Sequence, residues 1–213
     1  MDVRIPAASA VLDGTLELPA HPQGVVVFSH GSGSGRYSPR NRLVAAALRQ
    51  AGHATLLLDL LTVREDEDYE RRFDIELLTD RLAAAVRFLQ ERPATATLPV
   101  GLFGASTGAA SALRVAALLP ESIGAVVSRG GRPDLAGAAA LARVTAPTLL
   151  IVGDRDHGVI ELNEAARDAL ANCTCELVLV PGATHLFEEP GTLEEVAALA
   201  ARWFTTHLAS APR

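Results

Sequence analysis

The chain has 213 residues, 49% of them hydrophobic, and carries 25 acidic side chains against 19 basic ones, all of which are arginine. This length and apolar content fit one globular domain with a sizeable core. The lack of lysine excludes mechanisms that need one, such as a P-loop or a Ser/Lys dyad, and the formal net charge of −6 gives no basic surface for nucleic acid.

Neither the termini nor the cysteines indicate export, a membrane or a metal. Residues 1–14 lack the continuous apolar core of a signal peptide, and no stretch of about 18 apolar residues occurs in the chain. Cys173 and Cys175 are one residue apart, a spacing that neither closes a stabilising disulfide loop nor matches a known pair of metal ligands. We therefore expect a cytoplasmic protein with no membrane or nucleic-acid partner, no metal and no cofactor; the oligomeric state is left open.

The N-terminal part of the chain predicts a hairpin, a buried strand and a helix. Residues 3–19 alternate loosely between apolar and polar side chains around a turn signal at Asp13-Gly14, which indicates an antiparallel hairpin at the edge of a sheet. The apolar run 25–30 predicts a buried strand. Ser38 then stands at the position of an N-cap, before Pro39 at the first helical position.

Short apolar runs and longer amphipathic stretches alternate through the rest of the chain, which is typical of βαβ units and a parallel sheet. We expect the last helix to open with a capping box of Thr192 and Glu195, and the charged stretch 64–72 to be a solvated loop near the pocket. One domain is expected to cover residues 1–213. The expected strands are 54–60, 99–105, 124–129, 148–153 and 176–180, and the expected helices are 74–92, 106–119, a short one within 130–147, 161–171 and one from 192.

The segment Gly104-Ala105-Ser106-Thr107-Gly108 lies between a predicted strand and a predicted helix, the context that a G-x-S-x-G nucleophile elbow requires. The serine of such an elbow sits in a tight, strained turn. Glycines are needed at both flanks because a side chain there would collide with the neighbouring strand or helix. The motif predicts Ser106 as a nucleophile.

A serine nucleophile needs an adjacent base, which a carboxylate holds in the right tautomer. The carboxyl ends of parallel strands meet at one edge of a sheet, so residues that follow different strands come together there. Asp154 and Asp156 follow one strand and His185 follows the next, which gives the chain order Ser, Asp, His.

Position along the chain selects the base. His21 and His53 precede their strands, His207 is deep in the last helix, and His157 adjoins the candidate acid at the start of a helix. We therefore favour His185.

The acid has three candidates. We favour Asp156, because two more residues of loop let its carboxylate turn toward the base. Asp154 is the alternative, with a structural role expected for it, and Asp59 at the end of an earlier strand is a more distant one.

Acyl transfer also requires donors for a tetrahedral oxyanion, ideally backbone N–H groups. One is expected from Thr107, directly after the nucleophile, and the other from Ser32 in the glycine-rich loop His30-Gly31-Ser32-Gly33-Ser34-Gly35. His30 is expected to anchor this loop by hydrogen bonding.

Two arginines are candidates for substrate binding. Arg129 ends a predicted strand, so its guanidinium could hold an anionic group at the mouth of the site; pairing with Asp134 or another acid at the surface is the equal alternative. Arg36, and with it Arg40, lies beside the oxyanion loop and is open to the same two interpretations.

These residues resemble the α/β-hydrolase superfamily, and within it the small lidless enzymes similar to dienelactone hydrolases. The HGSGSG loop, the GASTG elbow, the GDRD acid loop and the GATHLF histidine loop occur in the family's order. The resemblance implies an eight-stranded, mostly parallel sheet with helices on both faces and hydrolysis of an ester or lactone through an acyl-enzyme. Dienelactone hydrolases proper use a cysteine nucleophile, whereas position 106 is serine, so the dienelactone substrate does not carry over.

The sequence thus predicts a serine hydrolase that acts on a small soluble ester, lactone or thioester. Between Arg129 and Thr148 there is room for one helix only, which excludes a large lid and favours small substrates. An acyltransferase with the same acyl-enzyme and a non-catalytic small-molecule binding module are the alternatives. A nucleotide-binding protein is disfavoured, because GSGSG lacks the G-x-G-x-x-G spacing and the chain lacks a Walker lysine.

Overall fold

The computed structural model describes residues 1–8 and 10–208. Eight strands form one sheet in the order β1-β2-β4-β3-β5-β6-β7-β8. From β4 to β8 all neighbours are parallel, whereas β2 pairs antiparallel with both β1 and β4. The strands are β1 (Asp2–Ala7), β2 (Ala10–Glu17), β3 (Val25–Ser29), β4 (Ala54–Leu58), β5 (Val100–Ala105), β6 (Ile123–Arg129), β7 (Thr148–Gly153) and β8 (Cys175–Val180).

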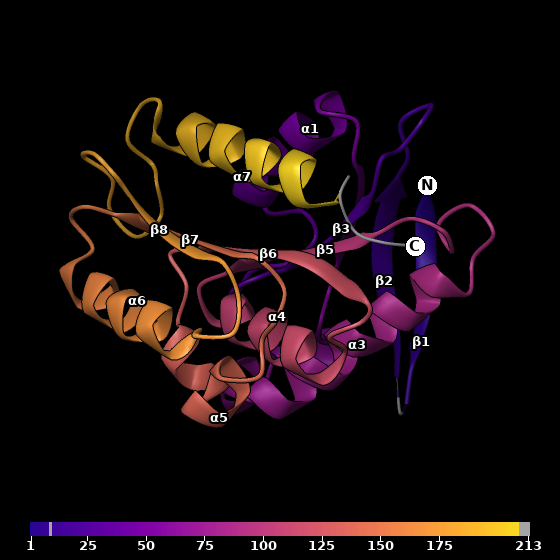
Figure 1. Cartoon of the computed structure of the whole chain (residues 1–213). Coiled ribbons are helices and arrows are strands. Elements are labelled where there is room, and N and C mark those ends of the chain that lie inside the picture. The colour runs from indigo at the N-terminus through magenta and orange to yellow at the C-terminus, as the bar shows by residue number, and fades with distance from the viewer. Residues whose placement is uncertain (9, 209–213) are drawn as a thin grey trace.

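Helices cover both faces of this sheet: α1 and α7 lie on one side, and α3, α4, α5 and α6 on the other (Figure 1). The predicted fold class, a mostly parallel sheet between two helical layers, is confirmed. The helices are α1 (Pro39–Gln50), α2 (Val63–Asp66), α3 (Ile75–Gln90), α4 (Thr107–Leu118), α5 (Ala138–Leu141), α6 (His157–Ala169) and α7 (Thr192–Leu208), with 3-10 turns η1 (Glu70–Phe73) and η2 (Pro133–Ala136).

The central strands are mostly apolar because both of their faces are covered, with Ser29, Thr55 and Thr148 as buried polar residues. Every residue of β3, β4, β5 and β7 is buried. A strand with helices on both sides has no solvent face, so it shows a continuous hydrophobic run instead of alternation. β1 alternates strictly between exposed and buried residues, since only one of its faces meets the core.

Two predicted helix starts are confirmed by their hydrogen bonds. Ser38 Oγ accepts from the amide of Asn41 at 3.4 Å, and Pro39 is the first residue of α1. Asp74 caps α3 in the same way, with its Oδ1 3.0 Å from the amide of Leu77. Both side chains satisfy backbone donors that the first helical turn leaves unpaired.

The predicted capping box of the last helix is wrong. Thr192 is the first residue of α7, and its hydroxyl donates to the carbonyl of Glu189 instead of accepting from Glu195. The amide of Glu195 bonds to the carbonyl of Gly191, because the helical ladder already reaches back past Thr192. A capping box does form elsewhere, between Thr62 and Glu65 at the start of α2.

The charged stretch 64–72 is not the open loop that was expected. It holds most of α2, whose first turn carries this capping box, and the start of η1.

The hairpin exists at the sheet edge as predicted, but Asp13 and Gly14 lie inside β2 and pair with Arg4 and Val3. A Cβ at position 14 would lie 3.2 Å from the side chains of Ile5 and Val3, so this glycine makes room for packing.

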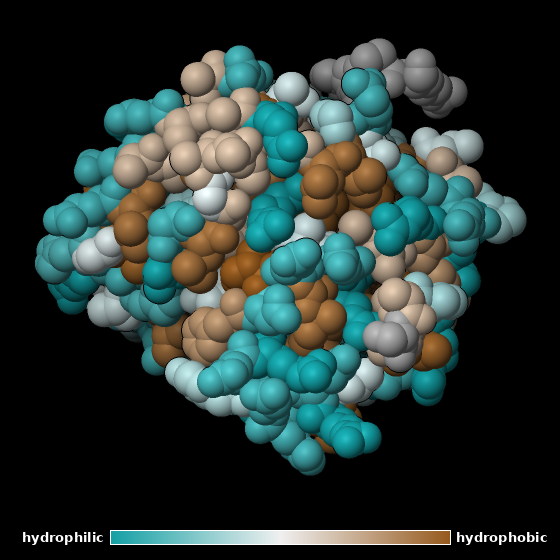
Figure 2. All heavy atoms as spheres, turned by 90° about the horizontal axis from the view of Figure 1, so that it is seen from below, coloured by the Kyte–Doolittle hydropathy of each residue, from teal (hydrophilic) through white to brown (hydrophobic). Residues whose placement is uncertain are grey.

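Among the described residues, every helix is too short or too polar to cross a bilayer. On the side of α3 to α6, several separate apolar patches are divided by hydrophilic side chains (Figure 2).

Candidate active site

Ser106 sits in a strained turn between β5 and α4. Its backbone has φ 50° and ψ −121°, a conformation that residues other than glycine rarely adopt. A Cβ at Gly104 would collide with the backbone of Ala109, and one at Gly108 would collide with the carbonyl oxygen of Ser29. Because both glycines let α4 approach the sheet this closely, the strained turn at Ser106 is held in place by packing.

Three side chains from three loops form a hydrogen-bonded chain at the carboxyl edge of the sheet. His185 Nε2 lies 3.3 Å from Ser106 Oγ, and His185 Nδ1 lies 2.6 Å from Asp156 Oδ2. An ionised carboxylate only accepts, so it places the ring proton on Nδ1 and leaves Nε2 free to accept from the serine hydroxyl. The structure therefore brings together the three side chains that the sequence singled out.

Asp154 and Asp156 have different partners although they share one loop. Asp156, immediately before α6, meets His185. Asp154 Oδ1 instead accepts from the amide of Gly182 at 2.8 Å and so ties the loop after β7 to the one that carries His185. The two carboxylates thus have different roles in the structure: Asp156 contacts the His185 ring, and Asp154 holds the loop that carries His185.

The sequence reasoning assigned no role to Glu189, which holds the histidine loop, or to Phe187 and Gly130, which lie in it and against it. Glu189 accepts from both the amide and the hydroxyl of Thr184, at 3.1 and 2.7 Å, and these bonds hold the pKa of its carboxyl below the ordinary value. Phe187 is buried with φ 55°. Gly130 packs against His185, where a Cβ would lie 3.2 Å from its carbonyl oxygen. An acid four residues after the base was the only local sign of this arrangement.

The two predicted oxyanion donors, the amides of Ser32 and Thr107, come from neighbouring loops, and the Ser32 amide already has a hydrogen-bond acceptor. The amide of Ser32 donates to Thr107 Oγ1 at 3.0 Å. Thr107 is the first residue of α4, so its own amide has no partner inside the helix. A Cβ on Gly31 would lie 3.1 Å from the Cβ of Ser106, which shows how closely the loop after β3 passes Ser106.

His30 fixes this loop, as expected. Its Nδ1 lies 3.0 Å from the carbonyl of Gly31 and its Nε2 accepts from the amide of Leu60 at 3.0 Å. Burial lowers the pKa of the His30 imidazole, which favours the neutral ring that these two contacts need. Asp59 holds the far end by accepting from the Arg36 amide at 2.7 Å.

The two candidate substrate-binding arginines differ. Arg36 Nε lies 3.4 Å from Asp59 and its Nη2 donates to Tyr37, so its guanidinium already has partners. Arg129 is 7% exposed and reaches Asn41 in the first turn of α1. Pairing of Arg129 with Asp134 does not occur, because Arg132 takes that carboxylate through two bonds of 2.9 and 2.7 Å.

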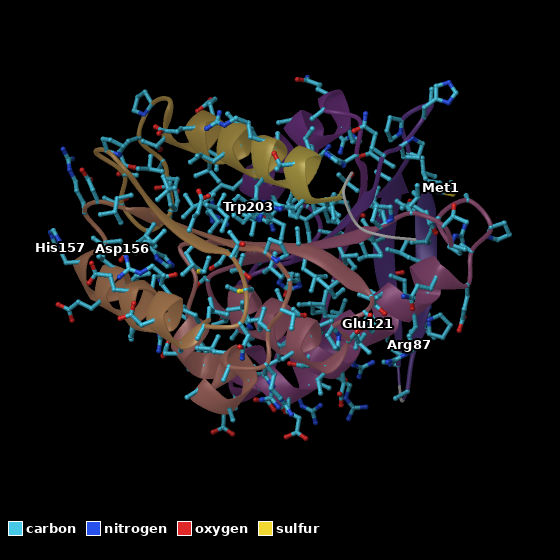
Figure 3. All side chains as sticks on the ribbon, viewed as in Figure 1. Met1, Arg87, Glu121, Asp156, His157 and Trp203 are labelled. Atoms are coloured by element: carbon cyan, nitrogen blue, oxygen red, sulfur yellow. The ribbon has the colours of Figure 1, made fainter. Side chains whose placement is uncertain are left out.

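His157, His53 and His207 are not part of the hydrogen-bonded chain of Ser106, His185 and Asp156. His157 opens α6 next to Asp156, and Figure 3 shows the two together at one end of the molecule. His53 is buried, with Nε2 3.1 Å from Thr205 Oγ1, and the His207 ring packs at a tilt of 54° against Trp203, with ring centroids 4.2 Å apart. Within residues 1–8 and 10–208, no group of three or more His, Cys, Asp or Glu side chains is arranged to hold a metal ion.

Comparison with known proteins adds the family. The dienelactone hydrolase family matches residues 12–208. The chain belongs to this family. A dienelactone hydrolase from Anabaena variabilis is 53% identical and superimposes with a TM-score of 0.94, over 98% of this chain and 97% of its own. The family supports hydrolase activity in the broad sense.

More distant structures share the fold alone. Est1E from Butyrivibrio proteoclasticus is 18% identical, with a TM-score of 0.83 over 98% of this chain and 99% of its own.

Two curated relatives extend well beyond the matched region. The Mycobacterium tuberculosis H37Rv protein named "Putative phosphoribosyl transferase Rv0571c" is 56% identical over 207 residues, which are 97% of this chain and 46% of that protein; its counterpart in strain CDC 1551 matches equally. The chain spans about half the length of these relatives. More than half of each relative's length lies outside the match, and their name describes the whole of these longer proteins.

Proposed function

We propose that the chain is a serine hydrolase that cleaves a small ester, lactone or thioester through an acyl-enzyme. The observation that carries the proposal is the hydrogen-bonded chain from Ser106 through His185 to Asp156, built on a strained turn next to backbone donors. Nucleophile, base and orienting acid in this geometry are what acyl transfer by a serine requires.

In the first half of the reaction, His185 Nε2 takes the hydroxyl proton of Ser106 while Oγ attacks the carbonyl carbon. The carbonyl electron pair moves to oxygen and forms the tetrahedral oxyanion. Asp156 stabilises the imidazolium and keeps it oriented. When the intermediate collapses, His185 returns the proton to the leaving group, and the acyl group stays on Ser106.

In the second half, water attacks the acyl-enzyme carbonyl as His185 takes its proton. The collapse of this second intermediate breaks the bond to Ser106, whose Oγ recovers the proton from His185, and the carboxylic acid leaves. The reaction is a hydrolysis because water is the acceptor. An alcohol or amine in its place would make the same acyl-enzyme an acyltransferase.

The oxyanion is held by the amides of Thr107 and Ser32. The Thr107 amide is an unpaired donor at the start of α4, where the helix dipole also favours negative charge. The Ser32 amide donates to Thr107 Oγ1 in the free protein and shares its hydrogen with the oxyanion during reaction. Thr107 therefore contributes twice, as a donor and as a support for the second donor.

The proposed substrates are small because the described segment 130–147, between β6 and β7, is too short for a large lid. Between β6 and β7 the described chain adds only η2 and α5, each of four residues, so no lid covers the site from this side. Phosphoribosyl transfer is not part of the proposal, since that name belongs to relatives of which the match covers 46%.

A fluorophosphonate probe tests the nucleophile directly. Wild type and Ser34→Ala, a serine in the loop after β3, are expected to be labelled, whereas Ser106→Ala is expected to lose both labelling and turnover of a chain-length panel of aryl esters. Labelling that persists in Ser106→Ala would refute the assignment.

The same experiment separates the alternatives. A wild type that is neither labelled nor active on any ester favours a non-catalytic binding module. Added alcohols or amines separate hydrolase from acyltransferase: free acid as the main product supports the hydrolase, and acylated acceptor as the main product overturns it.

A further inference from the structure

A buried amide lies on the inner face of α6, the helix that begins directly after Asp156. Asn163 is 0% exposed, and the other buried residue of this helix is Ala166. Val159 within the helix and Leu170 directly after it continue the same face at helical spacing, and both are apolar. Asn163 Oδ1 has no hydrogen-bond partner in the described part of the chain. An apolar side chain would pack here without a polar group to satisfy, so packing alone does not account for the asparagine.

The Asn163 side chain makes two hydrogen bonds to backbone carbonyls. Its Nδ2 donates to the carbonyl of Val159 at 2.8 Å, one turn earlier in α6, and to the carbonyl of Gly131 at 3.0 Å, in the loop after β6. A Cβ on Gly131 would collide with Ser128 Oγ and lie 2.7 Å from the Cβ of Ala109 in α4. The amide of Asn163 therefore joins α6 to a loop that is packed tightly against α4.

The loop that Asn163 holds is also bonded to both backbone groups of Ser106. The amide of Ser106 donates to the carbonyl of Arg129 at 3.2 Å, and the carbonyl of Ser106 accepts from the amide of Arg132 at 3.0 Å. These two bonds lie on either side of Gly131. Because Ser106 has a strained backbone with φ 50°, its conformation depends on such partners. A shift of the loop would therefore move the turn that carries Ser106.

The same loop contacts the proposed base. A Cβ on Gly130 would lie 3.2 Å from the carbonyl oxygen of His185 and 3.5 Å from its Nδ1, the ring nitrogen that meets Asp156. The amide of Gly130 donates at 2.7 Å to the carbonyl of Ile151 in β7, the strand that leads to Asp156. The loop after β6 thus lies against the base as well as against the turn of Ser106.

The helix α6 carries the proposed acid. The carbonyl of Asp156 accepts from the amides of Val159 and Ile160 at 2.9 and 3.0 Å, which fixes Asp156 to the first turn of α6. Asn163 follows about two helical turns later, so it lies on the same side of the helix as Asp156. A helix moves as a unit over so short a distance. The bond from Asn163 to the loop therefore sets where Asp156 stands relative to Ser106.

We propose that Asn163 is a positioning residue for the hydrolysis. Through the carbonyl of Gly131 it holds α6, and with it Asp156, in place against the turn that carries Ser106. The inference rests on the proposed function and deepens it. Asn163 acts through the loop and the helix, not by contact with the substrate. A displacement of about 1 Å between reacting groups can cost about a hundredfold in rate, which is the scale of the expected effect.

Three variants of α6 test this link. Asn163→Leu removes both hydrogen bonds at similar volume. Asn163→Ser keeps a donor for the carbonyl of Val159 one turn earlier, but its side chain is too short to reach Gly131. Ala166→Gly weakens the helix on the same buried face and leaves both bonds of Asn163 in place, so it is the control for a loss of stability.

Hydrolysis of 4-nitrophenyl acetate measures the effect on the reaction. Both Asn163 variants are expected to lower kcat by about tenfold to a hundredfold with little change in KM, because the substrate is still bound but the reacting groups are misplaced. The rate at which a fluorophosphonate labels Ser106 should fall in parallel. Ala166→Gly is expected to keep the wild-type kcat, and urea midpoints of the variants show whether the losses of stability are comparable.

Proton NMR adds a measurement that does not depend on catalysis. The Nδ1–H of His185, in its 2.6 Å contact with Asp156 Oδ2, is expected to give a signal far downfield of the amide protons. Asn163→Leu should shift this signal, because Asp156 moves with α6, whereas Ala166→Gly should leave it in place.

A wild-type kcat in both Asn163 variants would overturn the proposal. An equal fall of kcat in Ala166→Gly would also overturn it, since α6 would then act through stability alone. A wild type that hydrolyses no ester, but whose downfield signal moves in Asn163→Leu, would overturn the proposed function and leave the positioning by Asn163 standing.

Discussion

At the scale of single residues, the site depends on which way a carboxylate turns within a short loop. The amide of Asp156 bonds to the carbonyl of Gly153, and this turn sends the Asp156 side chain toward His185 while Asp154 faces the amide of Gly182. Asp156 meets the His185 ring, which becomes charged in the proposed reaction, whereas Asp154 meets an amide that stays neutral. We therefore expect Asp156 to affect activity and Asp154 to affect stability.

Their substitutions should separate activity from stability. Asp156→Asn keeps the shape but can no longer select the Nδ1–H tautomer, so kcat is expected to fall by about 10⁴ with the urea midpoint nearly unchanged. Asp154→Ala removes one hydrogen bond and is expected to cost about 1 kcal/mol of stability while most of the activity remains. Ester hydrolysis and urea unfolding of both variants measure this. The reverse pattern would show that Asp154 is the catalytic acid.

The sequence predicts which residue types meet at the site better than it predicts their surroundings. Ser106, Asp156 and His185 each follow a strand, and the edge where parallel strands end can be read from alternation alone. The loop length favours Asp156 over Asp154 from sequence, whereas the turn at Gly153, which directs the two side chains, is visible only in the structure. The burial of Arg129 could not be foreseen, because Asn41 and Phe187, which cover it, are far from it along the chain.

At the scale of elements, the position of α4 against the sheet depends on glycines. Gly104 in β5 and Gly108 in α4 leave no space for a Cβ, and each faces backbone atoms that cannot turn aside as a flexible side chain would. Thr107 is the first residue of α4, and Ser106, directly before it, adopts its strained backbone conformation where the chain enters the helix. The close contact therefore positions Ser106 and the Thr107 amide, the proposed nucleophile and oxyanion donor, at the same time.

A pair of glycine substitutions tests this. Gly108→Ala is expected to push α4 from the carbonyl of Ser29, with a loss of about 3 kcal/mol or more of stability and of esterase activity. Gly158→Ala in α6 meets open space and is expected to stabilise by about 0.5 kcal/mol. Urea midpoints of the two variants provide the measurement. Equal stability of both would show that α4 can shift without consequence.

Helix ends show where local patterns succeed and fail. Ser38 was predicted as an N-cap because it is a short polar side chain before Pro39 and a helical pattern, whereas for Asp74 the pattern predicted only the start of a helix. Thr192 has the same pattern, but the turn that precedes it already supplies helical carbonyls, so its hydroxyl is not needed as a cap. Thr62 caps a helix of four residues, too short to show a period in the sequence.

At the scale of the whole molecule, one buried ion pair joins parts of the chain that are distant in sequence. Arg81 in α3 reaches the carbonyl of Ala7 at the end of β1 and pairs with Glu65 in α2, so it links the hairpin, the segment after β4 and a helical layer. The capping box with Thr62 adds two further bonds to the same carboxylate residue. Loss of charge on Glu65 is therefore felt across several elements.

This link makes stability depend on pH in a defined direction. Burial alone would raise the pKa of the Glu65 carboxyl, but hydrogen bonds from Thr62 and the charges of Arg81 and Arg71 hold it below the ordinary value of 4.5. A carboxyl with a depressed folded-state pKa stabilises the fold above its unfolded pKa, and that contribution is lost as the pH falls through the folded-state value.

Glu65→Gln is accordingly expected to be less stable than wild type by about 2 kcal/mol at neutral pH. The difference should stay constant down to about pH 4.5, the ordinary value of the carboxyl, and shrink below it, because wild type then protonates the same group. Urea midpoints across this range measure it, with the exposed Glu67→Gln as a control for loss of one charge. A difference that grows as the pH falls would mean that the Glu65 carboxyl is protonated in the native protein, and the link through Arg81 would then be no more than a neutral hydrogen bond.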